Sequence, residues 1–316
     1  MNVLVTGGAG FIGSHTCEAL LARGESVICI DSFNDYYDPK QKELNIKECT
    51  KNSKFKLYRE DIRNLDKLKQ IFKENEIDKI IHLAAYAGVR YSIQNPLLYA
   101  DVNINGTMNL LDLAKSYKIQ NFVFASSSSV YGNNKKVPFS ETDNVDFPIS
   151  PYAATKKSCE LMCHTYHKLY DLNVTCLRFF TVYGPRGRPD MAPYKFTKII
   201  DEGKELPMFG DGTTKRDYTY VSDILNGILA ALDKDLEFEI INIGNSSTIE
   251  LREFITVIEK LLDKKANIKK KPMQPGDVNN TFADVSKAKE LLGYSPKISV
   301  EEGMKKFVSW YKKNKI

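Results

Sequence analysis

The sequence Gly7-Gly8-Ala9-Gly10-Phe11-Ile12-Gly13 lies between a short apolar run, 2–6, and a segment of helical periodicity, 11–23. Glycines at this spacing let the backbone turn sharply and approach a pyrophosphate, and the N-terminus of the following helix supplies unpaired N–H groups. This order predicts a dinucleotide-binding unit, although a glycine turn that only packs the helix on the strand would look similar. The residues expected to contact the dinucleotide here are Gly7, Gly10, Phe11, Ile12 and Gly13.

Apolar runs rich in β-branched residues alternate with segments of helical periodicity along much of the chain, which is typical of parallel strands joined by crossover helices. The sequence therefore predicts an α/β fold with a doubly wound parallel sheet, the Rossmann arrangement. The predicted strands are 2–6, 26–31, 55–59, 79–84, 121–126, 174–179 and 239–243. The predicted helices include 11–23, 65–74, 98–117 and 151–170.

This alternation ends after Phe180, where the loop-rich segments 184–189 and 209–213 begin a different organisation. We expect a second, smaller α/β lobe that binds the substrate. The predicted division gives 1–179 and 218–243 to the dinucleotide-binding domain and 180–217 and 244–316 to the second lobe.

The composition excludes several other classes of protein. The 316 residues carry 45 Lys and Arg against 40 Asp and Glu, a net charge of +5, which gives no electrostatic footprint for nucleic acid. The chain lacks an apolar run of membrane-spanning length and passes directly from Met1 into the first strand, so we expect neither a membrane protein nor a signal peptide. Scattered cysteines without disulfide or metal spacing indicate a cytoplasmic protein, and the histidines do not cluster, so no metal site is expected.

Two aspartates follow predicted strands and are candidates for binding the adenosine part of the dinucleotide. Asp31 ends the second strand, 18 residues beyond Gly13, where a carboxylate accepts hydrogen bonds from ribose hydroxyls and repels a 2′-phosphate. The sequence therefore favours NAD over NADP as cofactor. Asp61, after the third strand, lies where the adenine edge would fall, although an aspartate there is often only a helix cap.

A tyrosine and a lysine share one face of the helix that Ser150 and Pro151 are predicted to begin. Tyr152 and Lys156 are four residues apart and so lie one above the other. A phenol is a poor base at neutral pH because its ordinary pKa is about 10, but a nearby ammonium favours the phenolate. Serines 126–129 at the end of an earlier strand support a catalytic site over simple loop capping, because ligands bind at this edge of such sheets.

With these motifs in place, the chain resembles the extended short-chain dehydrogenase/reductase family and, within it, the NAD-dependent nucleotide-sugar epimerases and dehydratases. The resemblance covers essentially the whole chain. The segments that carry it are 6–13, 82–85, 103–107, 126–132, 152–156, 178–184, 216–223 and 292–296.

The resemblance implies a role for several of these residues. Tyr152 would act as the base, Lys156 would hold the nicotinamide ribose, and Ser127 would bond to the sugar O4. Further cofactor contacts that it implies are Ile62, Leu83, Ala84, Ala85, Asn103 and Phe179. In this family the helices corresponding to 98–117 and 151–170 commonly form a dimer interface, so a homodimer is expected.

The residues after Ser127 separate the reactions of this family. The 4,6-dehydratases carry Asp-Glu there, because removing water across C5 and C6 requires an acid and a base. UDP-glucuronate decarboxylases keep a glutamate at the second position. This chain has Ser128 and Ser129, which favours simple 4-epimerisation, in which hydride leaves C4, the 4-keto sugar rotates, and hydride returns to the other face.

The segments 87–92 and 178–192 resemble UDP-glucuronate 4-epimerases most closely. Thr181 replaces the asparagine of UDP-galactose 4-epimerases and can donate to a carboxylate. Arg90 and Arg188 are candidate partners for a diphosphate or a C6 carboxylate. Two departures from related patterns are Arg186, where tryptophan is usual, and Gln274, where a second arginine is often found.

Three further residues bear on which nucleotide sugar is the substrate and how it is held. Thr281 is small where epimerases restricted to UDP-glucose carry a tyrosine, so UDP-N-acetylglucosamine remains an alternative substrate, as does UDP-glucose. Arg216 and Asp277 resemble the groups that hold diphosphate and uridine ribose. A cofactor-sensing regulator of the same fold is a further alternative, but it would be expected to lack the Tyr152–Lys156 pair.

Overall fold

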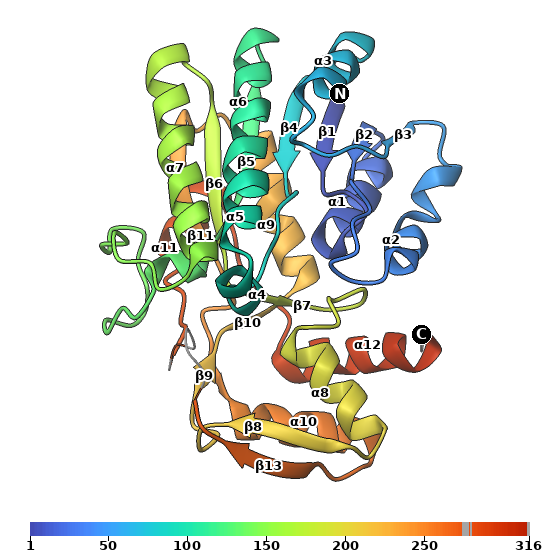
Figure 1. Cartoon of the computed structure of the whole chain (residues 1–316), viewed down its shortest axis with the longest axis vertical. Helices are drawn as coiled ribbons and strands as arrows, with labels where there is room; N and C mark the ends of the chain where they lie inside the picture. Colours follow the sequence, from blue (N-terminus) through green and yellow to red (C-terminus); the bar gives the residue numbers. More distant parts are fainter. Residues whose placement is uncertain (274–277, 279, 315–316) are drawn as a thin grey trace.

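The computed structural model describes residues 1–273, 278 and 280–314. Its main feature is a seven-stranded parallel sheet in the order β11-β6-β5-β4-β1-β2-β3 (Figure 1). The strands are β1 (Asn2–Thr6), β2 (Ser26–Ile30), β3 (Phe55–Tyr58), β4 (Lys79–His82), β5 (Asn121–Ser127), β6 (Val174–Phe179) and β11 (Phe238–Ile243). The strand order reverses between β1 and β4, and ligands bind at such a switch point. The predicted fold class is confirmed, and the strand bounds differ from the prediction by two residues at most.

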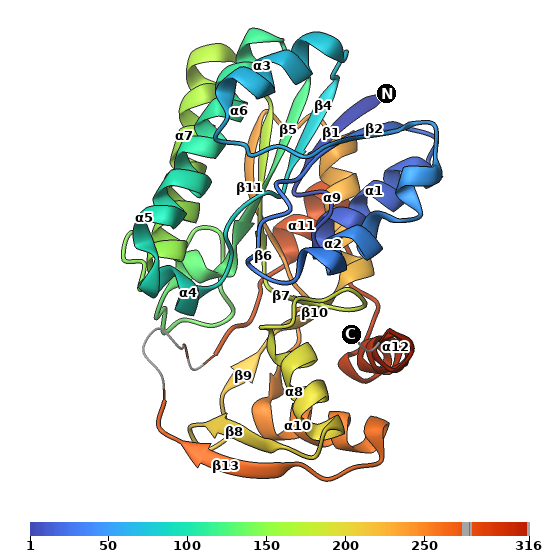
Figure 2. The same cartoon turned by 45° about the vertical axis from the view of Figure 1, so that its right-hand side comes forward.

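Helices cover both faces of this sheet, as Figure 2 shows from the side. One face carries α1 (Phe11–Ala22), α9 (Val221–Asp233) and α11 (Ser286–Leu292), and the other carries α3 (Leu65–Glu74), α6 (Gly106–Ser116) and α7 (Pro151–Tyr170). Successive side chains of a strand point to opposite faces. Accordingly Val3 and Val5 pack under α1, while Leu4, between them, packs on the α3 side.

The predicted helix 98–117 is interrupted in the structure. It consists of α5 (Pro96–Tyr99), a wide π turn at Ala100–Asn105, and α6. Within the π turn Asn103 bonds to both backbone groups of Tyr86 and to the Thr155 hydroxyl, with distances of 2.9–3.0 Å. These contacts join distant segments, so local periodicity does not reveal them.

The helix α2 (Pro39–Ile46) was not among the predicted helices. Three of the residues that it buries are polar, namely Gln41, Lys42 and Asn45, so its apolar periodicity is weak. Its beginning is nevertheless regular, because the Asp38 carboxylate caps the Lys40 N–H and Pro39 occupies the first turn.

The second lobe lies below the carboxyl edge of the sheet in Figure 1. It contains a parallel pair of strands, β8 (Glu205–Phe209) and β13 (Asn267–Lys271), with α8 (Ala192–Asp201), α10 (Leu251–Leu262) and α12 (Val300–Lys313). Phe254, Met304 and Phe307 lie in its apolar core. Two small sheets join the lobes: β7 (Thr181–Tyr183) with β10 (Tyr218–Tyr220), and β9 (Lys215–Arg216) with β12 (Ile249–Glu250).

The remaining short elements are α4 (Val89–Gln94) and 3₁₀ turns at Cys49–Lys51 and Ser128–Tyr131. Among the described helices, none is both long enough and apolar enough to cross a bilayer. The cysteines of the chain are all buried and unpaired.

Candidate active site

One cavity of about 1090 Å³ lies between the carboxyl edge of the sheet and the second lobe. Asn103 is not on its wall, and Asp277 and Gln274 lie outside the described residues. The sequence-predicted residues on its wall are Gly7, Gly10, Phe11, Ile12, Gly13, Asp31, Asp61, Ile62, Leu83, Ala84, Ala85, Arg90, Ser127, Ser128, Tyr152, Lys156, Phe179, Thr181, Arg188, Arg216 and Thr281.

The glycine loop after β1 fits a pyrophosphate. Gly7 has a φ of +68°, and a Cβ there would lie 2.8 Å from the Ala84 nitrogen. A Cβ on Gly13 would clash with the Gly7 carbonyl oxygen. Helix α1 begins without a side-chain cap and without an acidic residue in its first turn. The positive end of the helix dipole is thus available to an anion in the cavity.

Asp31 is buried at the end of β2, and its carboxylate accepts hydrogen bonds from three donors. Its Oδ2 accepts from the Ala9 N–H at 3.1 Å, and its Oδ1 accepts from the Phe33 N–H at 2.9 Å and the Lys42 Nζ at 3.0 Å. Lys42 also lines the cavity and was missed by the sequence analysis. The signal that could have found it is the Asp38-Pro39 helix start, which places Lys42 one turn into a helix.

The neighbouring residues Asp61 and Ile62 line the same end of the cavity. Asp61 forms an ion pair of 2.8 Å with Arg63, which also pairs with Asp101 at 2.8 Å. Ile62 packs against Gly106, where a Cβ would come within 2.5 Å of its Cδ1. The start of α6 therefore holds Ile62 in the wall.

Buried polar side chains hold the loop that follows β4 in place through hydrogen bonds. His82 bridges the hydroxyls of Thr6, at 2.7 Å, and Thr107, at 2.9 Å. Burial, together with the charge of Lys156, lowers the pKa of His82 to about 3, so its ring is neutral at physiological pH. Asn103 binds the backbone of this loop at Tyr86. We infer that Asn103 acts on the cofactor wall through the loop that it holds.

The predicted helix 151–170 is present as α7. The Ser150 hydroxyl accepts from the Ala153 N–H at 3.1 Å, which is an N-cap bond. Tyr152 is half-buried, and its ring meets Tyr99 edge-on with a centroid distance of 6.1 Å. Lys156 is buried, and its Nζ donates to the Ala125 carbonyl oxygen at 2.6 Å. Helix α7 thus places a phenol and an ammonium on the cavity wall.

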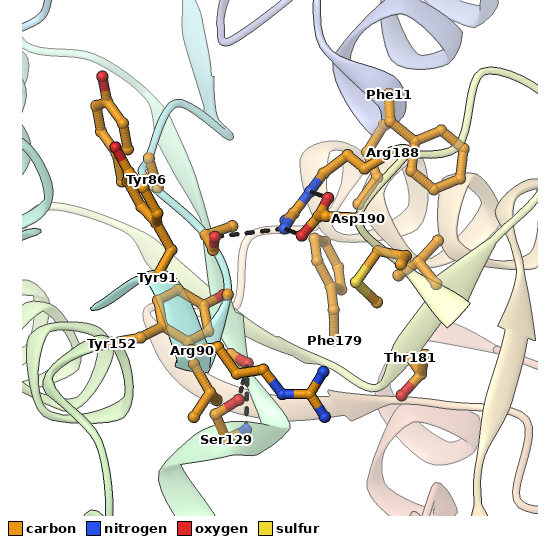
Figure 3. Close-up of a pocket in the computed structure, with 18 of the residues that line it drawn as sticks. Phe11, Tyr86, Arg90, Tyr91, Ser129, Tyr152, Phe179, Thr181, Arg188 and Asp190 are labelled. Carbon is orange, nitrogen blue, oxygen red and sulfur yellow. Dashed lines mark hydrogen bonds and ion pairs between the residues drawn. The ribbon is translucent and has the colours of Figure 1, made fainter. Parts of the chain in front are cut away.

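A row of serines ends β5 beside this pair. The Ser127 hydroxyl donates to the Ser129 Oγ at 3.1 Å and accepts from the Ser129 N–H at the same distance. Figure 3 shows Tyr152 and Ser129 on one side of the cavity and Thr181 on the other. This part of the cavity therefore presents hydroxyl groups, and positions 128 and 129 carry no carboxylate.

A buried ion pair supports the serine row. Glu160 accepts two hydrogen bonds of 2.8 Å from Arg178 and one of 2.6 Å from the Ser126 hydroxyl. Arg178 also donates to the Tyr131 hydroxyl at 3.0 Å. The motifs of the sequence did not predict Glu160, although its position four residues after Lys156 places it on the same helix face.

The predicted anion partners Arg90 and Arg188 lie in different surroundings. Arg188 forms a fork with Asp190, at 2.6 and 3.0 Å (Figure 3). It also donates to the Tyr36 hydroxyl at 3.2 Å. The guanidinium of Arg90 lies over the ring of Phe209, 5.4 Å from its centroid. Arg188 thus has an acidic partner within the chain, and Arg90 contacts an aromatic ring of the second lobe.

Arg186 joins the loop after β7 to the helix of the glycine loop. It pairs with Glu18 at 2.6 Å and donates to the Ser14 hydroxyl at 3.3 Å. His15, on the same helix, contacts the Pro185 carbonyl oxygen at 2.9 Å. An arginine in place of tryptophan at position 186 is explained by this acidic partner on α1.

Thr281 and Arg216 lie on the second-lobe side of the cavity. The Thr281 hydroxyl is buried and accepts from the Asp217 N–H at 3.1 Å. Arg216 donates to the Lys215 carbonyl oxygen at 2.9 Å. Over the described part of the chain, no group of three His, Cys, Asp or Glu residues is placed to hold a metal ion.

Comparison with known proteins agrees with this geometry. Residues 4–307 match the family model described as GDP-mannose 4,6 dehydratase. The chain is 48% identical over 312 residues to a UDP-glucuronate 4-epimerase of Thermodesulfobacterium geofontis, covering 98% of this chain and 96% of the relative.

Solved structures give the same result. The UDP-glucuronic acid 4-epimerase of Bacillus cereus, in complex with UDP-glucuronic acid and NAD, superposes with a TM-score of 0.94 at 42% identity, covering 99% of both chains. The UDP-glucose 4-epimerase of Thermotoga maritima with UDP-glucose has a TM-score of 0.92 at 35% identity, again with 99% of both chains. The glycine loop, the Tyr152–Lys156 pair and these matches together show that the chain belongs to the NAD-dependent nucleotide-sugar epimerase and dehydratase family of the extended short-chain dehydrogenases/reductases.

Proposed function

We propose that the protein interconverts UDP-glucuronate and UDP-galacturonate by NAD-dependent 4-epimerisation. The observation that carries this proposal is the hydroxyl-lined end of the cavity, where Ser129 lies on the side of Tyr152 and Thr181 lies opposite. Ser128 also lines this cavity. Elimination of water would require an acid and a base at the serine positions. The similarity to relatives named UDP-glucuronate 4-epimerase supports the same substrate.

In this proposal Tyr152 takes the proton from the sugar 4-hydroxyl and later returns it. The buried ammonium of Lys156 favours the phenolate and binds the nicotinamide ribose, and Ser127 orients the sugar O4. NAD supplies the chemistry of accepting hydride from C4 and giving it back. Phe179, which lines the cavity at the end of β6, would pack beside the nicotinamide.

The remaining wall residues are assigned to binding. We assign the adenosine ribose to Asp31 with Lys42, the adenine to Asp61 and Ile62, and the pyrophosphate to the Gly7–Gly13 loop. The loop 83–85, which also lines the cavity, would contact the rest of the cofactor. The UDP part of the substrate is assigned to Arg90, Arg188, Arg216 and Asp277, the last of which lies outside the described residues.

The cofactor should stay bound through purification. Because hydride returns to the sugar, no net oxidation occurs and exchange of NAD is not needed for turnover. Protein purified without added nucleotide should release NAD on denaturation, measured by chromatography, and should be active with little or no added cofactor. Release of NADP, or activity only with NADP, would show that Asp31 does not have the assigned role.

The 4-keto form of UDP-glucuronate is a β-keto acid and loses carbon dioxide when its carboxylate lies out of the ring plane. We assign the hydroxyls of Ser128 and Thr181 to holding that carboxylate near the plane. Hydrogen bonds to charged groups contribute about 1.5–3 kcal/mol each. Wild type should therefore form UDP-galacturonate with little pentose product, whereas Thr181→Ala or Ser128→Ala should release more carbon dioxide per epimer formed.

Thr181→Ser is the matched control, since it keeps the hydroxyl and should keep the wild-type product ratio. Released carbon dioxide and UDP-galacturonate are measured in the same reaction. A wild-type enzyme that forms mainly UDP-xylose or the 4-keto pentose would instead be a decarboxylase.

A second candidate substrate is UDP-N-acetylglucosamine, because the small Thr281 on the cavity wall leaves room for an acetamido group. Separate incubation with UDP-glucuronate, UDP-N-acetylglucosamine and UDP-glucose, with the C4 epimers resolved, decides between the substrates. Conversion of UDP-N-acetylglucosamine without conversion of UDP-glucuronate would favour this second candidate.

We further propose a cytoplasmic homodimer formed through α6 and α7. Leu161, Leu169 and Tyr170 on α7 are 55%, 65% and 48% exposed, an apolar surface that a second copy would cover. The unpaired buried cysteines support a reducing compartment. We also propose that residues 1–179 and 218–243 form the dinucleotide-binding domain and that residues 180–217 and 244–316 form the second lobe. Within the second set, α11 packs against α9 and β11 of the first domain.

A further inference from the structure

Two threonines of the cavity wall form hydrogen bonds with the backbone of the same residue, Asp217. Thr181, at the start of β7, donates its N–H to the Asp217 carbonyl oxygen at 3.1 Å. Thr281, 100 residues further along the sequence (281 − 181), accepts from the Asp217 N–H on its hydroxyl, also at 3.1 Å. Both hydrogen-bonding groups of the Asp217 backbone are therefore used by residues that line the cavity.

The side chain of Asp217 is itself held by four donors. It is fully buried, and its Oδ1 accepts from the Asn245 N–H at 2.7 Å and the Thr219 hydroxyl at 3.1 Å. Its Oδ2 accepts from the Ser246 N–H at 3.0 Å and the Ala283 N–H at 3.2 Å. The carboxylate thus binds the loop after β11 and the segment that carries Thr281.

The packing around this carboxylate leaves little freedom. A Cβ on Gly244 would lie 2.5 Å from the Ala283 Cβ and 3.2 Å from the Asp217 Oδ2. Ser246 has a φ of +50°, a conformation that its bond to Asp217 helps to maintain. A change in the Asp217 side chain must therefore move the surrounding backbone, and with it both threonines.

We propose that Asp217 is a positioning residue that fixes Thr181 and Thr281 relative to each other and so sets the orientation of the sugar ring in the cavity. This inference rests on the proposed function, in which Thr181 holds the sugar carboxylate. Reactive groups must be held to within about 0.5 Å of their productive geometry. The Thr281 hydroxyl accepts from the Asp217 N–H with one of its two lone pairs and keeps its own hydrogen for donation.

The test compares Asp217→Asn with Asp223→Asn. Asp223 is also a buried carboxylate, and it accepts from the Lys297 and Ile298 N–H groups at 3.1 Å, but it does not line the cavity. At position 217 both carboxylate oxygens accept hydrogen bonds, so the amide NH₂ of asparagine must replace one acceptor. At position 223 both backbone bonds go to one oxygen, which the amide of asparagine can supply. Asp217→Asn should therefore lower the melting temperature more than Asp223→Asn, and only the change at position 217 should alter the reaction.

With UDP-glucuronate, the ratio of released carbon dioxide to UDP-galacturonate should rise about three- to tenfold in Asp217→Asn. This factor corresponds to losing roughly one hydrogen bond that orients the sugar carboxylate. Asp223→Asn should keep the wild-type ratio. The ratio does not depend on how much of a preparation is folded, so a purely structural role would leave it unchanged. An unchanged ratio in Asp217→Asn would overturn the proposal.

Thr219→Val is a milder variant for the case in which Asp217→Asn does not fold. It removes one donor to the Asp217 Oδ1 and should shift the ratio in the same direction by a smaller factor. If wild type converts another UDP-sugar and not UDP-glucuronate, the proposed substrate is wrong. The role of Asp217 is then tested with that sugar. If KM and kcat change in Asp217→Asn but not in Asp223→Asn, Asp217 acts as a positioning residue. Equal effects in both variants would overturn the proposal.

Discussion

Tyr152→Phe should reduce turnover of UDP-glucuronate by about a hundredfold or more and leave nucleotide-sugar binding intact. The substitution removes the group that accepts the proton from the 4-hydroxyl, while the ring keeps its edge-on contact with Tyr99. The bond from Lys156 to the Ala125 carbonyl oxygen does not involve the lost hydroxyl. The measurements are kcat by epimer formation and Kd for the UDP-sugar by calorimetry.

Tyr99→Phe is the matched control. Its hydroxyl donates to the Ala87 and Gly88 carbonyl oxygens at 2.9 and 3.0 Å, and Tyr99 does not line the cavity. Turnover in this variant should stay within a few-fold of wild type. Near-normal turnover in Tyr152→Phe would rule out Tyr152 as the base, and equal loss in both variants would show that the effect comes from the loop after β4.

Glu160→Gln should lower the free energy of unfolding by about 3–5 kcal/mol, because it leaves the Arg178 guanidinium buried without a counter-ion. The pair is almost fully buried, with side-chain exposures of 0% for Glu160 and 1% for Arg178. The same change weakens the acceptor of the Ser126 hydroxyl, so activity should fall as well. Urea denaturation of both proteins gives the difference.

The chain offers an exposed pair of the same geometry as control. Glu43 accepts two hydrogen bonds from Arg59, at 2.6 and 2.8 Å, but both side chains are about half exposed, at 47% and 53%. Glu43→Gln should cost less than about 1 kcal/mol, because water replaces the lost partner. Similar losses at positions 43 and 160 would contradict the importance of burial for the Glu160–Arg178 pair.

Much of the fold follows from short-range patterns. The helix 151–170 was predicted to the residue, because Ser150 and Pro151 mark its start in the sequence itself. The strand β1 and the glycine loop likewise follow from adjacent residues. Helix α2 and the π turn at Ala100–Asn105 did not, since the contacts that stabilise them come from segments far away in the chain.

In the candidate site, too, features set by adjacent residues could be predicted and features set by distant contacts could not. Most of the site residues that the motifs predicted lie on the cavity wall, because many of these motifs lie at the end of a strand or the start of a helix. They did not predict Lys42, Glu160 or the acceptor role of Asp217. A polar side chain becomes buried only when its partner is supplied by another element, and that pairing is a property of the folded chain. Arg188 differs, because its acidic partner Asp190 is only two residues away and no motif pointed to this pair.

Lys42 and Asp31 cancel each other's charge at the adenosine end of the cavity. Replacing Asp31 by serine would remove the negative member and leave a buried ammonium with no counter-ion of its own. The 2′-phosphate of NADP carries the charge that such a group lacks, so the dinucleotide itself would complete the ion pair. In the proposed mode of binding, selection against the 2′-phosphate therefore depends on the charge balance between Asp31 and Lys42, and Asp31→Ser should shift the preference towards NADP.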